Sequence, residues 1–554
     1  MCSAAMLLSV TACSDFLTVD VDGYSTDQNG YNTQYKLQAA LNATYDILQT
    51  DQFNSCDWRF GEATADDVWG NDEGLSTQMG QLVNFRFDTN NEWVKSRYEI
   101  NYKGIHRANQ VIAHASEVVL SNTDYSSYRS MRELLGQAKF LRALFYFNLV
   151  KTYGGVPIRP EIETVDNLVI PRSTAEEVYA YIERDLREAS IMLPARFTGT
   201  ECGKASAGAS LALLMKVLMY QAVPGEDSEK WRDMVTIGRY FVDGQSMTLS
   251  DVLKYDKLYE EDWETLRCRL WFKPQAITVS TDIYEGPDYQ MPVIKNSYSL
   301  EYKNYYNTAM SYIDQFFATG EFCSSSIFEI VFKESADGTD GDVNEGSSQF
   351  DVLYRDDQNP AVYSTSGIIT EIFGTDPRKT YTIGHQEYTP DGTLCNSGPG
   401  KIVSLKWYTP MMERPQYDGD NGKNRRLIRY PEVVLMYAEA LNECGNSAES
   451  LAQLNKCKTQ VNTINGSTAL YIGGGYGYIR DQIWKERRME FAFEWDRFFD
   501  LVRQKRAATV IQNYGLQRAN KRGYYFRAGV NELFPIPQSE IDISNGVVTQ
   551  NPGY

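Results

Sequence analysis

The residues best suited to chemistry lie in a short polar stretch near position 70, where a tryptophan stands among carboxylates and an amide. Trp69 lies between Asp67 and Asn71, and residues 66–72 show no amphipathic period that would place the ring in a core. A flat indole ring can cover the apolar C–H face of a sugar ring, while Asp67 and Asn71 can exchange hydrogen bonds with its hydroxyl groups. The stretch therefore indicates contact with a hydroxylated ring. The alternative is that Trp69 packs within its own loop.

Patterns for catalysis or metal binding are weak elsewhere. The chain has only three histidines and contains no HExxH, GxSxG or P-loop motif. Residues 340–351 partly mimic a calcium loop, but Glu345 occupies the position that needs glycine and Asp351 the position that needs glutamate. We therefore expect no cofactor and no metal. Since 73 acidic residues always offer some carboxylate pair, a surface glycosidase remains an alternative.

Composition narrows the class of protein. The 554 residues carry a net charge of −19, with 42% hydrophobic and 23% charged residues, which is typical of a soluble globular chain. Phosphate backbones would repel so acidic a protein, so nucleic acid is not expected as a partner. Aromatic residues reach 13%, with 38 tyrosines. Tyrosine combines an apolar ring with a polar tip and suits binding surfaces.

The N-terminus has the pattern of a lipoprotein signal. A short apolar stretch at residues 4–12 ends directly before Cys13, and Val10 precedes that cysteine by three positions, which resembles a bacterial lipobox. We expect a signal peptide at residues 1–12, acylation of Cys13 and a polar tether over residues 13–33, so that lipid tethers the protein to a membrane. The alternative is a plain signal peptide with an incidental cysteine. Among the other cysteines, Cys444 and Cys457 either pair across a helical hairpin or stay free.

The elements that must position these residues are mainly helical. Periodic apolar residues predict helices over residues 34–250, including one that ends at Gly154 and one that begins at Ser173 or Thr174, in hairpins resembling tetratricopeptide pairs. Residues 251–425 form a loop-rich, partly β insertion with a strand at 327–332, and helices return over residues 426–554. The expected fold class is a mainly α, tetratricopeptide-like superhelix whose insertion forms the binding face.

The charged residues between 486 and 503 invite an active-site interpretation. Their spacing alternates with an apolar stripe over residues 479–506, which instead predicts one packed helix with ion pairs. These residues are Glu486, Arg487, Arg488, Glu490, Asp496, Arg497, Asp500 and Arg503.

Several segments together resemble the SusD/RagB family of outer-membrane nutrient-binding lipoproteins. The resemblance follows the chain in order, behind the lipobox, and covers nearly all of it. Its segments are residues 102–109, 138–157, 429–440, 486–503, 533–537 and 550–554.

The resemblance implies a tetratricopeptide-like body that docks on a SusC-like TonB-dependent transporter as its lid and captures oligosaccharide or, in some relatives, peptide. It implies that Trp69 supplies a stacking ring, Asn71 an amide and Arg59 a guanidinium, although the spacing at Arg59 differs from the family pattern. A second contributing segment holds Phe350, Tyr354, Arg355 and Tyr363. Tyr284 and Tyr289 lie in an insertion relative to the family and are further candidates, with surface packing as the alternative.

The sequence therefore predicts a non-catalytic, lipid-anchored protein of the cell surface that binds a glycan and passes it to a transporter. A peptide-binding protein of the RagB type is the alternative within the family, and a surface glycosidase is the alternative outside it.

Overall fold

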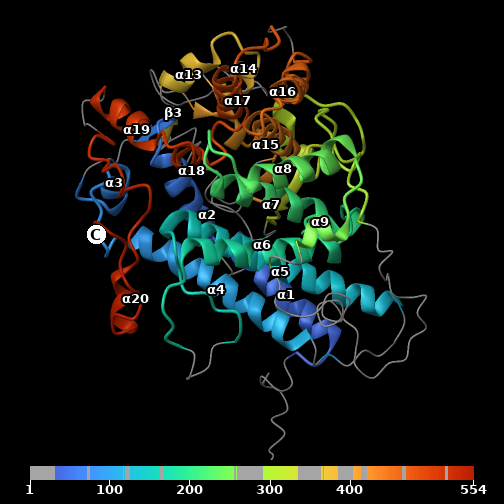
Figure 1. The fold of residues 1–554 in the computed structure, drawn as a ribbon, viewed down its shortest axis with the longest axis vertical. Coiled ribbons are helices and arrows are strands. Elements are labelled where there is room, and N and C mark those ends of the chain that lie inside the picture. The colour runs from blue at the N-terminus through green and yellow to red at the C-terminus, as the bar shows by residue number, and fades with distance from the viewer. Residues whose placement is uncertain are drawn as a thin grey trace, which may run out of the picture.

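Figure 1 shows a computed structural model of the chain, in which helices dominate. The structure describes residues 31–70, 75–115, 118, 125–162, 168–254, 258, 291–334, 363–365, 367–384, 403–413, 421–464, 469–517 and 522–554. The mainly helical fold class is confirmed.

The N-terminal part is an array of helices that pack on one another in chain order. Along the chain, α4 packs on α5, α5 on α6, α6 on α7 and α7 on α8, while α1 lies against α4 and α5. The helices are α1 (Gln34–Gln49), α2 (Asp51–Trp58), α3 (Gln78–Val83), α4 (Glu92–His114), α5 (Tyr125–Tyr153), α6 (Ala175–Met192), α7 (Ala207–Gln221) and α8 (Glu229–Gly238).

Local signals set the ends of these helices as the sequence predicts. α5 stops at Tyr153 because Gly154 follows with a φ of 73°, a left-handed conformation that favours glycine. α6 begins after Thr174, whose hydroxyl oxygen accepts a hydrogen bond from the amide of Glu177, while the Glu177 carboxylate accepts one from the amide of Thr174.

The C-terminal helices continue the same array. α15 (Tyr430–Glu443) packs on α8 although almost 200 residues separate them, and α16 (Ser447–Val461) and α17 (Tyr476–Glu490) pack on α15 (Figure 1). Shorter helices follow: α18 (Arg497–Arg503), α19 (Ala507–Leu516) and α20 (Gln538–Ile543).

The expectation of one helix over residues 479–506 is wrong. The chain leaves the helix after Glu490 because Phe493 and Trp495 take left-handed conformations, with φ values of 65° and 72°. Tertiary contacts stabilise this break: the Trp495 ring stacks on Trp407 at 4.2 Å, and Trp407 Nε1 donates a hydrogen bond to the Phe493 carbonyl. A helical period in the sequence does not register such contacts.

The insertion contributes short antiparallel strand pairs and short helices. β1 (Val68–Gly70) pairs with β3 (Tyr363–Thr365), β2 (Ser326–Ile330) with β6 (Arg425–Arg429), and β4 (Ile383–Gly384) with β5 (Val403–Ser404). The predicted strand at 327–332 is therefore present as β2. The short helices are α9 (Leu249–Leu253), α13 (Gly367–Phe373) and α14 (Lys379–Thr382); single 3₁₀ or π turns cover Arg59–Ala63, Gly199–Glu201, Arg239–Asp243, Ile313–Phe316, Ala318–Gly320, Leu405–Trp407 and Met411–Glu413.

The C-terminal tail lies over the end of α5 and fixes the chain there. The Phe534 amide donates to the Thr152 carbonyl at 2.8 Å, and the Asn551 side-chain amide donates to the carbonyls of Tyr153 and Phe534. Arg172 donates to the Asn551 side-chain oxygen at 2.7 Å and so joins the tail to the connector before α6.

Two negative findings apply to the described residues. Cys444 and Cys457 both carry free thiols, so the hairpin disulfide is not formed. Within the same described ranges, every helix is too short or too polar to cross a bilayer.

Candidate functional site

The segment that leads to Trp69 is built as helix, π turn and strand. α2 runs into the π turn Arg59–Ala63, and β1 begins at Val68. The Arg59 guanidinium lies over the Trp93 ring at 3.5 Å from its centroid and over the Trp58 ring at 4.6 Å. These cation–π contacts hold Arg59 against two indole rings of the body. The structure thus gives Arg59 a packing role in this half-buried position.

Two aspartates at the start of β1 are held by arginines from the C-terminal helices. Arg488 Nη2 donates to Asp66 at 2.8 Å and Arg488 Nε donates to Asp67 at 3.0 Å, while Arg497 Nε donates to Asp66 at 2.8 Å. We call these four residues the arginine clamp. Asp67 is 1% exposed, so its carboxylate faces Arg488 inside the protein. Asp67 is therefore bonded within the protein and is not among the proposed ligand contacts.

The electrostatics of the clamp follow from burial and from these partners. Burial by itself raises the pKa of Asp66, but the charges of Arg497 and Arg488 outweigh it and hold that pKa well below its usual value. For Asp67, burial prevails over the charge of Arg488, and its pKa is raised. The two arginines therefore favour the ionised form of Asp66.

The backbone of β1 is fixed from two sides. On one side β3 pairs with it, with Trp69 opposite Ser364 and Gly70 opposite Tyr363. On the other side Arg522 Nη1 donates to the Val68 carbonyl at 2.6 Å. The strand that carries Trp69 is therefore set between the insertion and the segment that follows α19.

The two segments that the family resemblance assigns to the ligand thus meet in one strand pair. Trp69 is the central residue of β1, and Tyr363 begins β3. The remaining candidates lie outside the described residues: Cys13, Asn71, Tyr284, Tyr289, Phe350, Tyr354 and Arg355.

Sequence reasoning missed the contribution of Arg488, Arg497 and Arg522 to this site. The helical pattern indicated ion pairs for Arg488 and Arg497, but their partners lie more than 420 residues away in the chain. Arg522 follows α19 and carries no recognisable motif. The two adjacent aspartates before Trp69 are the one sequence feature that could have indicated cationic partners, since buried carboxylates need them.

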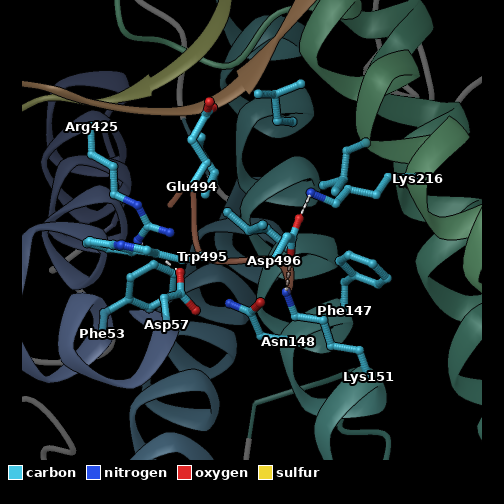
Figure 2. Close-up of a pocket in the computed structure, with 14 residues that line it drawn as sticks. Phe53, Asp57, Phe147, Asn148, Lys151, Lys216, Arg425, Glu494, Trp495 and Asp496 are labelled. Atoms are coloured by element: carbon cyan, nitrogen blue, oxygen red, sulfur yellow. Dashed lines mark ion pairs between the residues drawn. The ribbon is translucent and has the colours of Figure 1, made fainter. Parts of the chain in front are cut away.

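A small cavity elsewhere in the body is lined by apolar side chains and by ion-paired residues (Figure 2). Arg425 donates to Asp57 at 2.9 Å and lies over the Trp495 ring, while Lys151 and Lys216 both contact Asp496. Burial lowers the pKa of Lys151 to about 8, against the charge of Asp496. The cavity measures about 30 Å³, which is room for about one water molecule and not for a sugar.

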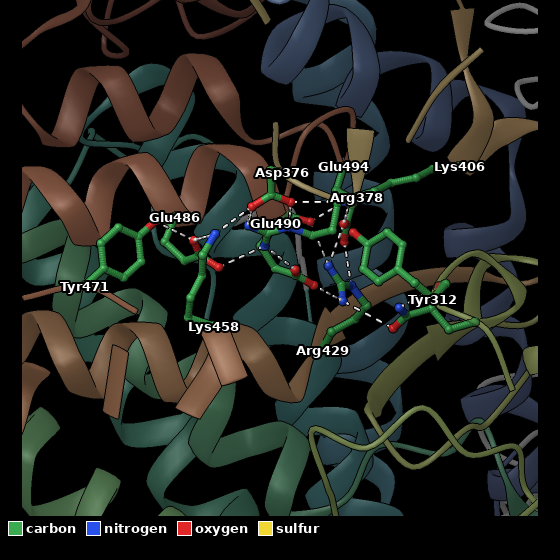
Figure 3. A network of polar contacts seen from close by, with 11 residues as sticks. Tyr312, Asp376, Arg378, Lys406, Arg429, Lys458, Tyr471, Glu486, Glu490 and Glu494 are labelled. Carbon is green, nitrogen blue, oxygen red and sulfur yellow. Dashed lines mark hydrogen bonds and ion pairs between the residues drawn. The ribbon is translucent and has the colours of Figure 1, made fainter. Parts of the chain in front are cut away.

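The charged motif of α17 belongs to a second buried network (Figure 3). Arg378 donates to Glu490 at 2.8 Å and to Asp376 at 2.9 Å, Arg429 donates to Glu490 at 2.8 Å, and Lys458 donates to Asp376 at 2.7 Å. These contacts join the insertion to α16, α17 and β6. The ion-pair interpretation of the motif is confirmed, although most partners lie on other elements instead of along one helix.

Taken together, the fold defines a helical, tetratricopeptide-like scaffold with a loop-rich insertion laid against its C-terminal helices. Two family models match the chain: one described as "SusD family" over residues 334–554, and one described as "Starch-binding associating with outer membrane" over residues 15–219. The chain belongs to the SusD/RagB family.

Curated relatives match 90% or more of this chain at low sequence identity. "SusD-like protein P2" of Formosa agariphila is 24% identical to this chain, and the match covers 99% of this chain and 98% of the relative. A SusD-like protein of Bacteroides ovatus is 22% identical, and the match covers 90% of this chain and 81% of the relative. Among solved structures, a "Laminarin binding SusD-like protein" gives a TM-score of 0.69 at 23% identity, covering 95% of this chain and 100% of that one. "Surface glycan-binding protein A from Bacteroides thetaiotaomicron in complex with laminarihexaose" gives a TM-score of 0.67 at 19% sequence identity, and the match covers 94% of this chain and 99% of that one. At these identities the structures establish the fold.

Proposed function

We propose that this protein is a non-catalytic glycan-binding lipoprotein of the cell surface. It captures oligosaccharide and delivers it to a SusC-like TonB-dependent transporter of the outer membrane, for which it acts as the lid. Acylation of Cys13 anchors it. The observation that carries the proposal is the pairing of β1 with β3, because it joins the Trp69 segment to the insertion at one place.

The proposed site is centred on Trp69. The indole ring covers the C–H face of one sugar unit, and Asn71 pairs with its hydroxyl groups. Phe350, Tyr354, Arg355, Tyr284 and Tyr289 are the candidate further contacts from the insertion. Arg59 and the arginine clamp position the strand and do not touch the ligand.

The clamp matters because binding by a few contacts depends on preorganisation. A strand fixed by ion pairs and by β3 loses little freedom when a glycan stacks on it. Relatives described as binding laminarin or laminarihexaose support a glycan as the ligand class. The description of the N-terminal family model supports association with the outer membrane.

The test is affinity electrophoresis of the purified protein in gels containing laminarin, starch, xylan or mannan, together with an assay for released reducing ends. Retardation by one glycan without product supports the proposal. Release of reducing ends would instead assign a glycosidase. If no glycan retards the protein and it binds a peptide mixture, it would be assigned as a peptide-binding protein.

Co-purification with a TonB-dependent barrel from native membranes tests the lid role. Recovery of the protein as a lone monomer, with the barrel present but unbound, would contradict that role.

A further inference from the structure

A second concave site is lined by residues of α4 and α20. Both helices are labelled in Figure 1. We call this site the α4–α20 pocket: its walls come from α4, from the connector between α5 and α6, and from the C-terminal tail. Its volume is about 230 Å³, far more than the water-sized cavity of Figure 2. None of its lining residues belongs to β1, to β3 or to the arginine clamp.

The walls of this pocket are fixed by contacts within the protein. The Tyr102 hydroxyl donates to the Pro157 carbonyl at 2.7 Å, and Arg159 Nη2 donates to the Leu168 carbonyl at 2.9 Å. Arg172 and Asn551 join the connector to the tail, as described above. The pocket is therefore largely preformed, so its side chains lose little conformational entropy when a ligand binds.

Apolar side chains form its mouth. Leu168, Val169 and Ile543 are 52%, 43% and 69% exposed and line the same pocket. The half-buried Tyr102 ring also lines it and packs against the Tyr98 ring. Apolar surface of this kind, left open to water beside a concavity, favours a ligand with an apolar face.

Polar groups of both signs converge inside it. Glu99, Glu540 and Arg159 all line the pocket, so it offers two carboxylates as acceptors and one guanidinium as a donor. Burial raises the pKa of Glu540, and the nearby charge of Glu99 adds to this effect. Lys95 Nζ lies 3.5 Å from the Glu99 carboxylate, and Lys95 and Arg159 are the two cations near Glu540, so two cationic groups balance the two carboxylates. This mixture of donors and acceptors suits a neutral ligand with several hydroxyl groups.

We propose that the α4–α20 pocket binds a single neutral pyranose unit, separate from the site at Trp69. The apolar mouth covers the C–H face of the ring, while Glu540 and Glu99 accept and Arg159 donates hydrogen bonds at neighbouring hydroxyls. Such a pocket gives the protein a second, weak contact with a long or branched glycan, and two linked contacts raise the avidity for a polymer over that for a short oligosaccharide.

The experiment is saturation-transfer NMR with the methyl β-glucoside, methyl α-mannoside and methyl β-galactoside at millimolar concentration. Four variants are compared with the wild type: Glu540→Gln, Ile543→Trp, Asp542→Asn and Trp69→Ala. Glu540→Gln keeps the shape of the side chain and removes the charged acceptor, and Ile543→Trp fills the mouth from an exposed position. Asp542→Asn is the matched control, since Asp542 lies on the same helix, is exposed and does not line the pocket.

We expect transfer to at least one glycoside in the wild type, in Asp542→Asn and in Trp69→Ala. In Glu540→Gln the affinity should fall roughly tenfold, because a hydrogen bond to a charged carboxylate is replaced by a weaker one to a neutral amide oxygen. Ile543→Trp should abolish the signal. The proposal is overturned by absence of transfer to all three glycosides, by equal transfer in Glu540→Gln and Ile543→Trp, or by its loss in Trp69→Ala. That last outcome would place the sugar at the first site and leave the proposed function standing.

Discussion

Arg488 forms an ion pair with Asp67, its partner 421 residues earlier in the chain, with Arg488 Nε 3.0 Å from the carboxylate. The contact ties the last long helix of the array to the residue two before Trp69. A strand of three residues cannot hold itself in place, because a lone strand pair is marginally stable in water. The position of Trp69 is therefore set by a helix from the far end of the sequence.

Replacing this arginine should weaken both folding and binding. Arg488→Met leaves Asp66 and Asp67 buried with less compensation, and breaking a buried pair in this way costs about 3–5 kcal/mol of unfolding free energy. Lys485→Met, at an exposed position of the same helix, should change it by less than about 0.5 kcal/mol. Chemical denaturation measures the unfolding free energy of both variants. Calorimetry with the cognate glycan should show reduced affinity for Arg488→Met below its melting range, and wild-type affinity in a destabilised variant would contradict a positioning role.

Glu321 predicts a pH dependence of stability. Burial raises its pKa to about 7, while Arg426 opposes the shift, and the Glu321 carboxylate accepts a hydrogen bond from the backbone amide of Asn424. Because the folded state binds this proton more tightly than the unfolded state, the contribution of Glu321 to stability falls as pH rises from about 4.5 to about 7. Glu321→Gln, which mimics the protonated form, should gain about 1–3 kcal/mol over the wild type at pH 8 and almost nothing at pH 4.

Thermal melts at both pH values test this sign. Glu371→Gln, an exposed carboxylate on α13, serves as the control and should show no such pH-dependent gain. A gain for Glu321→Gln that is larger at pH 4 than at pH 8 would rule out a raised pKa as the cause.

Residues close to the ends of the helices were sufficient to predict much of the helical fold from sequence. Gly154 and the Thr174–Glu177 capping box act within a few residues, so the end of α5 and the start of α6 could be predicted from sequence. The break after Glu490 could not, because the stacking of Trp495 on Trp407 is a contact between distant segments. The same reason explains the candidate site: residue types around Trp69 suggested a ligand contact, but nothing near Asp67 in sequence shows that Arg488 buries it.

The lipid anchor predicts a change in cell fractionation. Cys13→Ala should move the protein from the membrane fraction to the soluble fraction, since the acyl chains supply the membrane affinity. Cys2→Ala changes a cysteine within the signal segment and should leave the protein in membranes. Detergent-free fractionation with immunoblotting measures the distribution, and retention of Cys13→Ala in membranes would refute acylation at that residue.

Trp69 should be the main stacking platform for the glycan. Loss of a stacked ring typically costs about 1–3 kcal/mol, which lowers a binding constant roughly ten- to a hundredfold. Trp69→Ala, measured by calorimetry against the glycan that retards the wild type, should show this loss with a melting temperature close to that of the wild type, because the strand is held by its backbone pairing and by the clamp. Tyr35→Ala removes a ring that is 83% exposed on α1 and should keep full affinity. Unchanged affinity in Trp69→Ala would move the platform to Tyr284, Tyr289 or Tyr354, whereas a collapsed melt would show that the ring packs within the body.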